Sequence, residues 1–284
     1  MSRLDAALRR ARALNDQQPE TPQGEPKVER MSRALAALAD APPAVPHSNS
    51  PTNVRTAEFY AEKLVVTERP AQSTIEQYRK LAATLHHAQT ERQLKVVMVS
   101  SAVSGDGKTL TSTNLALTLS ESYRRRVLLI DADLRRPSIH EVFQVKNVHG
   151  LTDSLKAESD RRLPLIQASA YLSLLLAGRP DSDPMSGLTS GRMRRLIGEA
   201  AATFDWVIID TPPVVLLPDA NLLAAMVDAA VLVIGAGKTP HKLISRAVDA
   251  LGRNRILGVV LNRVDPSCLA GGYGYGYYAY GERG

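Results

Sequence analysis

The sequence has few of the features that stabilise secreted proteins or anchor membrane proteins. It contains one cysteine, Cys268, so no disulfide can form within the chain and a reducing compartment is expected. The six histidines show no spacing typical of a metal site. No apolar run approaches the roughly 20 residues of a membrane-spanning helix, because the best candidate, residues 222–236, is interrupted by Asp228. Since the N-terminus also lacks the apolar core of a signal peptide, we expect a soluble cytoplasmic protein.

Acidic residues are fewer than basic ones, and the net charge is therefore +6 with a pI of about 9.5. Such a balance tolerates nucleic acid or an anionic membrane surface as a partner. The arginines, however, lie in short clusters, such as residues 124–126, 135–136 and 192–195. None of these clusters is interleaved with the aromatic residues on which single-stranded nucleic acid stacks. We therefore expect no nucleic-acid partner and interpret most of these arginines as solvated surface.

Composition divides the chain into three regions. Residues 1–55 hold seven of the 17 prolines and few large apolar side chains, which predicts a disordered, flexible N-terminal extension with short helical patterns at 2–14 and 32–39. Residues 56–269 have the composition of a globular domain. Residues 270–284 combine glycine with five of the nine tyrosines and show no core-facing period. We expect this third region to be a flexible tail.

The central region alternates between strand-like and helix-like segments. Several of the strand-like segments are continuous Val/Ile/Leu runs, as expected when helices cover both faces of a parallel sheet. This order predicts a doubly wound α/β fold with a mostly parallel sheet. The predicted strands are 95–100, 126–131, 171–176, 206–210, 229–235 and 256–262, and the predicted helices include 108–120, 191–202, 218–227 and 240–253.

A phosphate-binding loop follows the first predicted strand. Residues 101–109 read SAVSGDGKT and match the P-loop pattern, except that Ala102 occupies the position usually filled by the first glycine. Glycines let the backbone N–H groups of such a loop turn toward phosphate oxygens, and the following helix adds its positive end. Lys108 is expected to bridge the β- and γ-phosphates of ATP, and the Thr109 hydroxyl to ligate Mg²⁺. The predicted ATP-binding residues in this segment are Ser104, Gly105, Asp106, Gly107, Lys108, Thr109 and Leu110.

Three aspartates stand at the ends of two other predicted strands. Asp131 and Asp133 follow one strand in IDADLRRP, and Asp210 ends another in IIDTPP. Because ligands of an open parallel sheet bind at the carboxyl ends of its strands, these carboxylates are expected to converge on the P-loop. There they can hold metal-bound water or accept a proton. The alternative for a single aspartate is a structural cap on the following turn.

These motifs together resemble the bacterial tyrosine kinases of capsule and exopolysaccharide biosynthesis, in the form of a separate cytoplasmic kinase. The resemblance covers residues 70–284 and includes the IDADLRRP element, which is the second Walker A motif of that family, and the tyrosine-rich tail. It implies a MinD-like P-loop fold and an ATP- and Mg²⁺-dependent protein-tyrosine autokinase. The implied phosphorylation sites are Tyr273, Tyr275, Tyr277, Tyr278 and Tyr280.

The resemblance also implies roles for individual residues. Lys108, Asp131 and Asp133 would be catalytic, with Asp131 as the base for the tyrosine hydroxyl. The metal ligands would be Thr109, Asp133 and Asp210, and Asn262 would lie near the adenine.

The family carries an E-x-x-R-x-x-R helix that is used for self-assembly. Here Glu76 and Arg79 match this motif, and Ala82 replaces its second arginine. A second interpretation of Glu76 is a capping box with Ser73 at the start of the helix. The resemblance further implies a homo-oligomer, a separate transmembrane activator of the chain-length-regulator type that recruits the kinase to the inner face of the cell membrane, and a cognate tyrosine phosphatase.

Two alternatives share the expected fold. One is a ParA/MinD-type positioning ATPase, but the signature lysine of that class would stand at Val103, five residues before Lys108. The other is a catalytically weak module that binds nucleotide and gates export. The retained lysine, threonine and aspartates argue against this module.

Overall fold

The computed structural model describes residues 56, 60, 63–66, 72–157, 163–216 and 219–265. The expected extensions at residues 1–55 and 270–284, with their helical patterns and the five tail tyrosines, lie outside the described residues. The predictions for these regions stay predictions.

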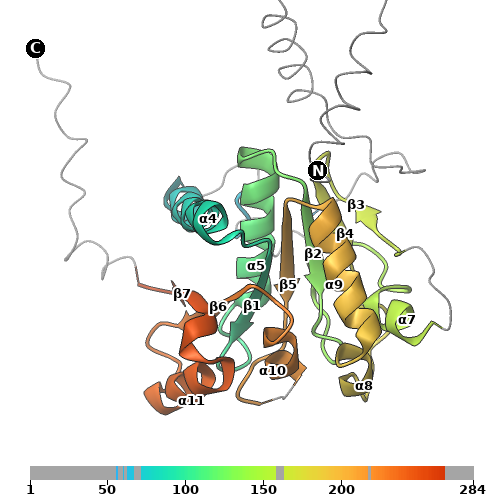
Figure 1. The fold of residues 1–284 in the computed structure, drawn as a ribbon. Helices are drawn as coiled ribbons and strands as arrows, with labels where there is room; N and C mark the ends of the chain where they lie inside the picture. The colour runs from blue at the N-terminus through green and yellow to red at the C-terminus, as the bar shows by residue number, and fades with distance from the viewer. Residues whose placement is uncertain are drawn as a thin grey trace, which may run out of the picture. The chain divides into compact units, whose positions relative to one another are not determined.

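The described residues form a seven-stranded sheet in the order β3-β4-β2-β5-β1-β6-β7 (Figure 1). Neighbouring strands run parallel, except that β3 is antiparallel to β4. All six predicted strands are present, whereas β3 was not predicted because it is only two residues long. The strands are β1 (Val96–Ser101), β2 (Val127–Asp131), β3 (Ile166–Gln167), β4 (Leu172–Leu175), β5 (Trp206–Asp210), β6 (Ala229–Gly235) and β7 (Ile256–Asn262).

Successive residues of the central strands enter two separate hydrophobic clusters. In β1, Val96 and Met98 join one cluster, and Val97 and Val99 join the other. Both faces of the sheet are therefore buried, which is why these strands are continuous apolar runs. Each fully buried Val, Leu or Ile side chain contributes roughly 1.5–3 kcal/mol relative to exposure.

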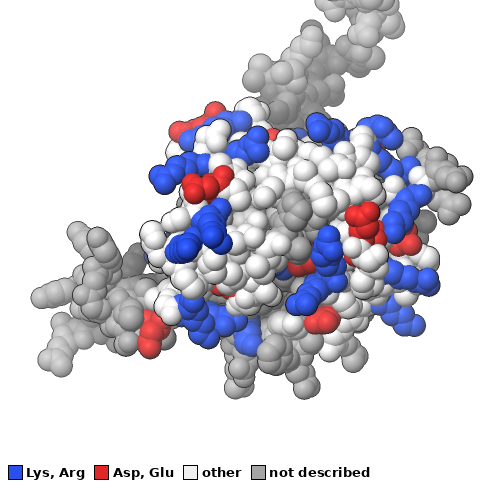
Figure 2. Space-filling model, turned by 90° about the horizontal axis from the view of Figure 1, so that it is seen from below, with Lys and Arg blue, Asp and Glu red and all other residues white. Residues whose placement is uncertain are grey.

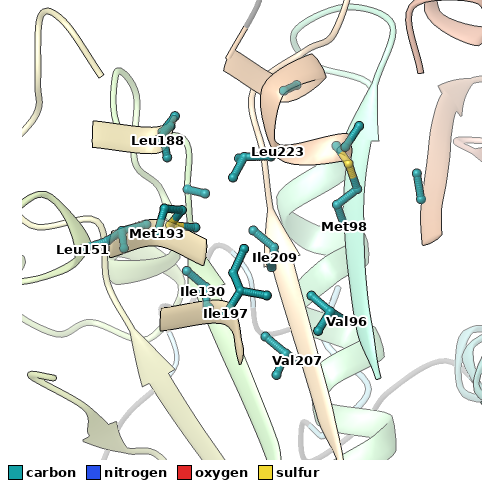
Figure 3. Close-up of a cluster of buried hydrophobic side chains, with 14 of the residues drawn as sticks. Val96, Met98, Ile130, Leu151, Leu188, Met193, Ile197, Val207, Ile209 and Leu223 are labelled. Carbon is teal, nitrogen blue, oxygen red and sulfur yellow. The ribbon is translucent and has the colours of Figure 1, made fainter. Parts of the chain in front are cut away.

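The first cluster lies between the sheet and five helices. Met193 and Ile197 of α9 pack among side chains from β1, β2 and β5, as Figure 3 shows. Helix α9 begins after Ser190, whose side chain accepts a hydrogen bond from the backbone N–H of Met193. The helices on this face are α7 (Leu151–Lys156), α8 (Met185–Leu188), α9 (Gly191–Thr203), α10 (Asp219–Ala224) and α11 (His241–Leu251).

The second cluster is covered by α4 (Gln72–Arg92), α5 (Lys108–Leu117), the π-helical turn η1 (Thr118–Ser122) and α6 (Ile139–Val142). The helix predicted over 108–120 therefore ends earlier, because its last turn is π-helical. A short 3-10 turn, η2 (Arg253–Arg255), leads into β7. None of the helices in the described ranges is both long and apolar enough to cross a membrane.

The topology places a crevice at the carboxyl end of β1. Strand β1 lies between β5 and β6. From β1 the chain continues to β2, on the β5 side, whereas from β6 it continues to β7 in the opposite direction. The strand order therefore reverses beside β1, which is where open α/β sheets bind their ligands. The P-loop and Asp210 lie at this edge.

Candidate active site

The P-loop connects β1 to α5 through two glycines in the left-handed region. Gly105 has φ +86° and Gly107 has φ +98°. A Cβ on Gly107 would lie 1.9 Å from Nδ2 of Asn262, so this position accepts only glycine without rearrangement. Ala102, in place of the usual first glycine, has no exposed surface and does not have a positive φ. An alanine is therefore compatible with that position.

The backbone N–H groups of residues 104–109 have no acceptor among the described residues. They belong to the glycine turns and to the first turn of α5, where a helix leaves N–H groups unpaired. An anion with several oxygen atoms satisfies such groups. This part of the loop therefore fits a phosphate chain.

Asp106 supports the loop from behind. Its Oδ1 accepts a 2.6 Å hydrogen bond from Oγ1 of Thr239, and its Oδ2 accepts one of 3.3 Å from the backbone N–H of Val103. The Asp106 carbonyl oxygen accepts a 2.8 Å bond from Nδ2 of Asn262. The Asp106 side chain is thus bonded to the protein. Of this residue, the backbone N–H is the group that can make the predicted contact with ATP. Asn262 packs against the phosphate loop, and its predicted place near the adenine stays a prediction.

Lys108 and Asp133 form an ion pair inside the site. Nζ of Lys108 lies 3.0 Å from Oδ2 of Asp133, and the two side chains are 13% and 6% exposed. Burial lowers the pKa of Lys108, but the charges of Asp210 and Asp133 outweigh burial, so that the pKa is raised from its ordinary value. Lys108 is therefore positively charged in the site at neutral pH.

Thr109 joins β5 and the loop after β2. Its Oγ1 donates a 2.7 Å hydrogen bond to Oδ2 of Asp210 and accepts one of 3.0 Å from Oγ of Ser138. Oδ1 of Asp210 is buried and has no hydrogen-bond partner among the described residues. Burial is the main cause that raises the pKa of Asp210, while Lys108 opposes it. Because Mg²⁺ prefers hard oxygen ligands, Thr109, Asp210 and Asp133 fit this ion.

Asp131 lies beside Asp210 and organises the loop after β2. The two aspartates are register partners in β2 and β5. Oδ2 of Asp131 accepts hydrogen bonds of 3.0 Å from the backbone N–H groups of both Ser138 and Ile139. Burial is the largest cause that raises the pKa of Asp131, to about 7, and the charge of Asp210 is the second. The two backbone hydrogen bonds lower this pKa but do not outweigh them. Asp131 therefore fills the structural role of a turn cap, and its carboxyl group also has a proton affinity suited to a base near neutral pH.

A cavity of about 840 Å³ opens over these groups. This volume lies within the usual range for small-molecule sites. All the predicted ATP-binding residues except Asp106 line it, together with Asp133. Asp131 and Asp210 are fully buried and lie outside the lining. Further lining residues that the sequence did not indicate are Tyr60, Lys63, Arg135, Arg136, Ser138, Pro213, Leu216 and Arg263.

The cavity lining is positively charged. The lining contains one carboxylate, that of Asp133, and five basic residues, which are Lys63, Lys108, Arg135, Arg136 and Arg263. The pair at 135–136 is thus an exception to the interpretation of the arginine clusters as solvated surface. Figure 2 views the molecule from below, the side toward which β1, β2 and β5 point in Figure 1, and shows separate groups of Lys and Arg around a largely uncharged centre. A cationic lining attracts a polyphosphate.

The two residues of the predicted assembly motif lie on α4. Glu76 and Arg79 form a 3.0 Å ion pair one helical turn apart, with side chains 42% and 49% exposed. Helix α4 begins at Gln72, so Ser73 lies within its first turn and does not cap it. The predicted capping box is therefore wrong. An exposed pair of this kind contributes at most about 1 kcal/mol to stability, which leaves both side chains available to a partner.

The fold and the P-loop define a class of nucleotide-binding proteins. The family model of the CobQ/CobB/MinD/ParA nucleotide binding domain matches residues 97–270. Among curated proteins, the tyrosine-protein kinase YwqD of Bacillus subtilis is 37% identical over 228 residues, which are 79% of this chain and 94% of YwqD. The tyrosine-protein kinase wzc of Salmonella typhi is 32% identical over 226 residues, 78% of this chain but only 31% of wzc.

A solved structure gives the same result. The kinase domain of the Escherichia coli tyrosine kinase ETK superposes with a TM-score of 0.65 at 30% identity and covers 82% of this chain and 89% of that domain. The chain belongs to the bacterial tyrosine kinase family. The MinD-like P-loop fold and the kinase family predicted from the sequence are thereby confirmed, and the positioning ATPase is the less supported alternative.

Proposed function

We propose that this chain is a protein-tyrosine kinase that transfers the γ-phosphate of ATP to the tyrosines of its own tail. The observation that carries the proposal is the convergence of Lys108, Thr109 and Asp133 on one cationic cavity of about 840 Å³, with Asp210 buried behind it and hydrogen-bonded to Thr109. The acceptors are Tyr273, Tyr275, Tyr277, Tyr278 and Tyr280.

Each residue of the site has a role in the proposed transfer. Lys108 and the N–H groups of residues 104–109 bind and orient the β- and γ-phosphates. Thr109, Asp133 and Asp210 would hold Mg²⁺, which when bound would neutralise charge on the transferring phosphoryl group. The tyrosine oxygen forms a bond to the γ-phosphorus, the bond to the β-phosphate oxygen breaks, and ADP leaves.

Asp131 accepts the proton of the tyrosine hydroxyl in this proposal. Because Asp131 has no exposed surface, a tyrosine reaches it only if the turn that carries Ser138 moves. The hydroxyl keeps its proton until late in the transfer, since its ordinary pKa is near 10.

The partners follow from the family. The proposed role is control of exopolysaccharide or capsule polymerisation and export, at the inner face of the cell membrane. A separate transmembrane activator of the chain-length-regulator type recruits the kinase there, α4 contributes Glu76 and Arg79 to a homo-oligomer, and a tyrosine phosphatase reverses the reaction.

The test is phosphotyrosine formation by the purified chain. The chain is incubated with Mg-ATP and the cytoplasmic segment of its activator, and the added phosphates are counted by intact mass. Lys108→Met and a chain ending before Tyr273 are expected to gain no phosphotyrosine. Phosphate release without phosphotyrosine would favour the positioning ATPase, and neither product would favour the nucleotide-gated module. Phosphotyrosine that persists in Lys108→Met would contradict the proposed mechanism.

A further inference from the structure

A short segment before α4 is bound to the P-loop helix. We call residues 60 and 63–66 the N-terminal strap. The amide side chain of Asn114, in α5, donates a 2.8 Å hydrogen bond from Nδ2 to the carbonyl oxygen of Lys63 and accepts one of 2.9 Å at Oδ1 from the backbone N–H of Val65. Asn114 has no exposed surface. A buried amide that makes two bonds to one backbone segment fixes the position of that segment.

Hydrophobic burial fixes the strap a second time. Leu64 is fully buried and belongs to the second hydrophobic cluster. This cluster also contains Leu115 of α5, Val97 of β1 and Ile208 of β5. Burying such a side chain contributes roughly 1.5–3 kcal/mol. The strap is therefore packed on the nucleotide-binding helix, although 49 residues separate Val65 from Asn114 in the sequence.

The other side of the strap lines the ATP cavity. Tyr60 and Lys63 belong to the lining, together with Lys108 and Thr109. A 2.9 Å bond from the backbone N–H of Lys63 to the carbonyl oxygen of Tyr60 holds these two residues in one turn. The strap therefore adds a lysine to the lining of a cavity whose expected ligand is a polyphosphate.

Helix α4 meets the strap at the same asparagine. Tyr78 of α4 is partly buried, and burial raises the pKa of its hydroxyl, while the side chains of Asn114 and Thr111 lower it. Thr111 in turn donates a 3.0 Å hydrogen bond to the carbonyl oxygen of Gly107 in the P-loop. The strap, α4 and the P-loop are therefore joined through one face of α5.

We propose that the N-terminal strap is part of the nucleotide site, in which Lys63 contacts the phosphates of ATP and Asn114 is a positioning residue that holds Lys63 in place. The inference rests on the proposed function only in that the cavity binds ATP. It assigns phosphate binding to a segment outside the P-loop, the IDADLRRP element and the IIDTPP element.

The experiment measures the dissociation constants of Mg-ATP and of adenosine by titration calorimetry on the full chain. Lys63→Ala is expected to weaken ATP binding about tenfold, which corresponds to about 1.4 kcal/mol, and to leave adenosine binding unchanged. The matched control is Lys80→Ala, which removes an exposed lysine of α4 outside the cavity and is expected to bind ATP as the wild type does.

A double-mutant cycle tests the positioning role. Asn114→Ala is expected to weaken ATP binding as Lys63→Ala does, and the double variant to lose less than about twofold more, because a displaced lysine no longer contacts the ligand. Val65→Pro removes the N–H donor to Asn114 without a change in α5 and gives the same expectation. Far-UV circular dichroism shows that each variant is folded.

Two results would overturn the inference. One is an ATP affinity of Lys63→Ala equal to that of Lys80→Ala. The other is full additivity of Lys63→Ala with both Asn114→Ala and Val65→Pro, which would remove the positioning role. A wild-type chain that binds ATP but forms no phosphotyrosine would contradict the proposed function, while the binding constants would still decide the role of the strap.

Discussion

The two loops that meet in the candidate active site differ in the residues that determine their backbone conformation. Both follow parallel strands and lead into helices, but the P-loop is built on glycines and the loop after β2 on aspartates. The N–H groups of residues 104–109 have no acceptor among the described residues, whereas those of Asp133, Arg136, Ser138 and Ile139 are bonded to the carboxylates of Asp131 and Asp133. The first loop therefore presents backbone to a ligand, and the second presents side chains.

This difference assigns separate tasks to the two loops. A loop with unpaired N–H groups binds phosphate without regard to the rest of the ligand. The loop after β2 has four N–H groups already paired, and its contribution to the site is the ion pair of Asp133, the hydroxyl of Ser138 and two cavity-lining arginines. Substitutions in the two loops should therefore separate phosphate binding from the support of the site.

Breaking the glycine loop has the largest expected effect. Gly107→Ala places a Cβ within 1.9 Å of Nδ2 of Asn262 at a positive φ, so the ATP affinity should fall at least about 100-fold. Gly105→Ala, at positive φ but in open space, should lose less. The control is Gly198→Ala on the exposed face of α9, which should stabilise the fold by about 1 kcal/mol and leave ATP binding unchanged. Equal ATP affinity in all three variants would refute the assigned role of the glycines.

Removing the carboxylate that holds the second loop should reduce stability. Asp131→Ala leaves the N–H groups of Ser138 and Ile139 without their acceptor, which should cost about 3 kcal/mol in urea unfolding at pH 5. Asp131→Asn keeps an acceptor oxygen and should recover most of this loss, but it should not recover phosphotyrosine formation. Equal instability of both variants would contradict the assignment of this loop's stability to hydrogen bonds accepted by residue 131.

The same aspartate predicts a pH dependence of stability in the metal-free chain. Asp131 has a pKa near 3.8 when unfolded and about 7 when folded, so the folded state binds the additional proton between these values. The free energy of unfolding should therefore decrease as the pH rises from 4 to 7, by at most about 1.4 kcal/mol per pH unit, and level off above 7. Urea unfolding in EDTA measures this, and Asp131→Asn should show a flatter profile.

The smallest effect is expected for substitutions at the hydrogen bond between Thr239 and Asp106, which supports the P-loop. Thr239→Val removes the hydroxyl that donates to Oδ1 of Asp106 and should cost about 1 kcal/mol of stability, with a loss of ATP affinity of a few fold. Thr239→Val also leaves the N–H of Gly235 without its acceptor, so each of Thr239→Val and Asp106→Ala loses two hydrogen bonds. Asp106→Ala should lose more ATP affinity, because its second bond, from the N–H of Val103, lies within the P-loop. ATP binding that is unchanged in Asp106→Ala would show that the glycines alone shape the loop.

The two loops also differ in how far the sequence predicts them. Glycine spacing and Lys108 are local signals, and they identified the P-loop together with its strand and helix. The role of Ser138 depends on a hydrogen bond across 29 residues, and that of Asn114 on bonds across 49 and 51 residues. No local pattern contains such pairs. Similarly, β3 is a strand only because β4 lies beside it, and the π-helical turn after Leu117 has no signal in residue type.

Strand β5 contains a residue whose fluorescence can report on the opening of the sheet. Trp206 is the only tryptophan of the chain, it is fully buried, and it lies four residues before Asp210. When the sheet opens, the indole passes from hydrocarbon into water, and its fluorescence emission moves to longer wavelength. Because no second indole contributes to the signal, an emission spectrum of the unlabelled protein reports on strand β5 alone.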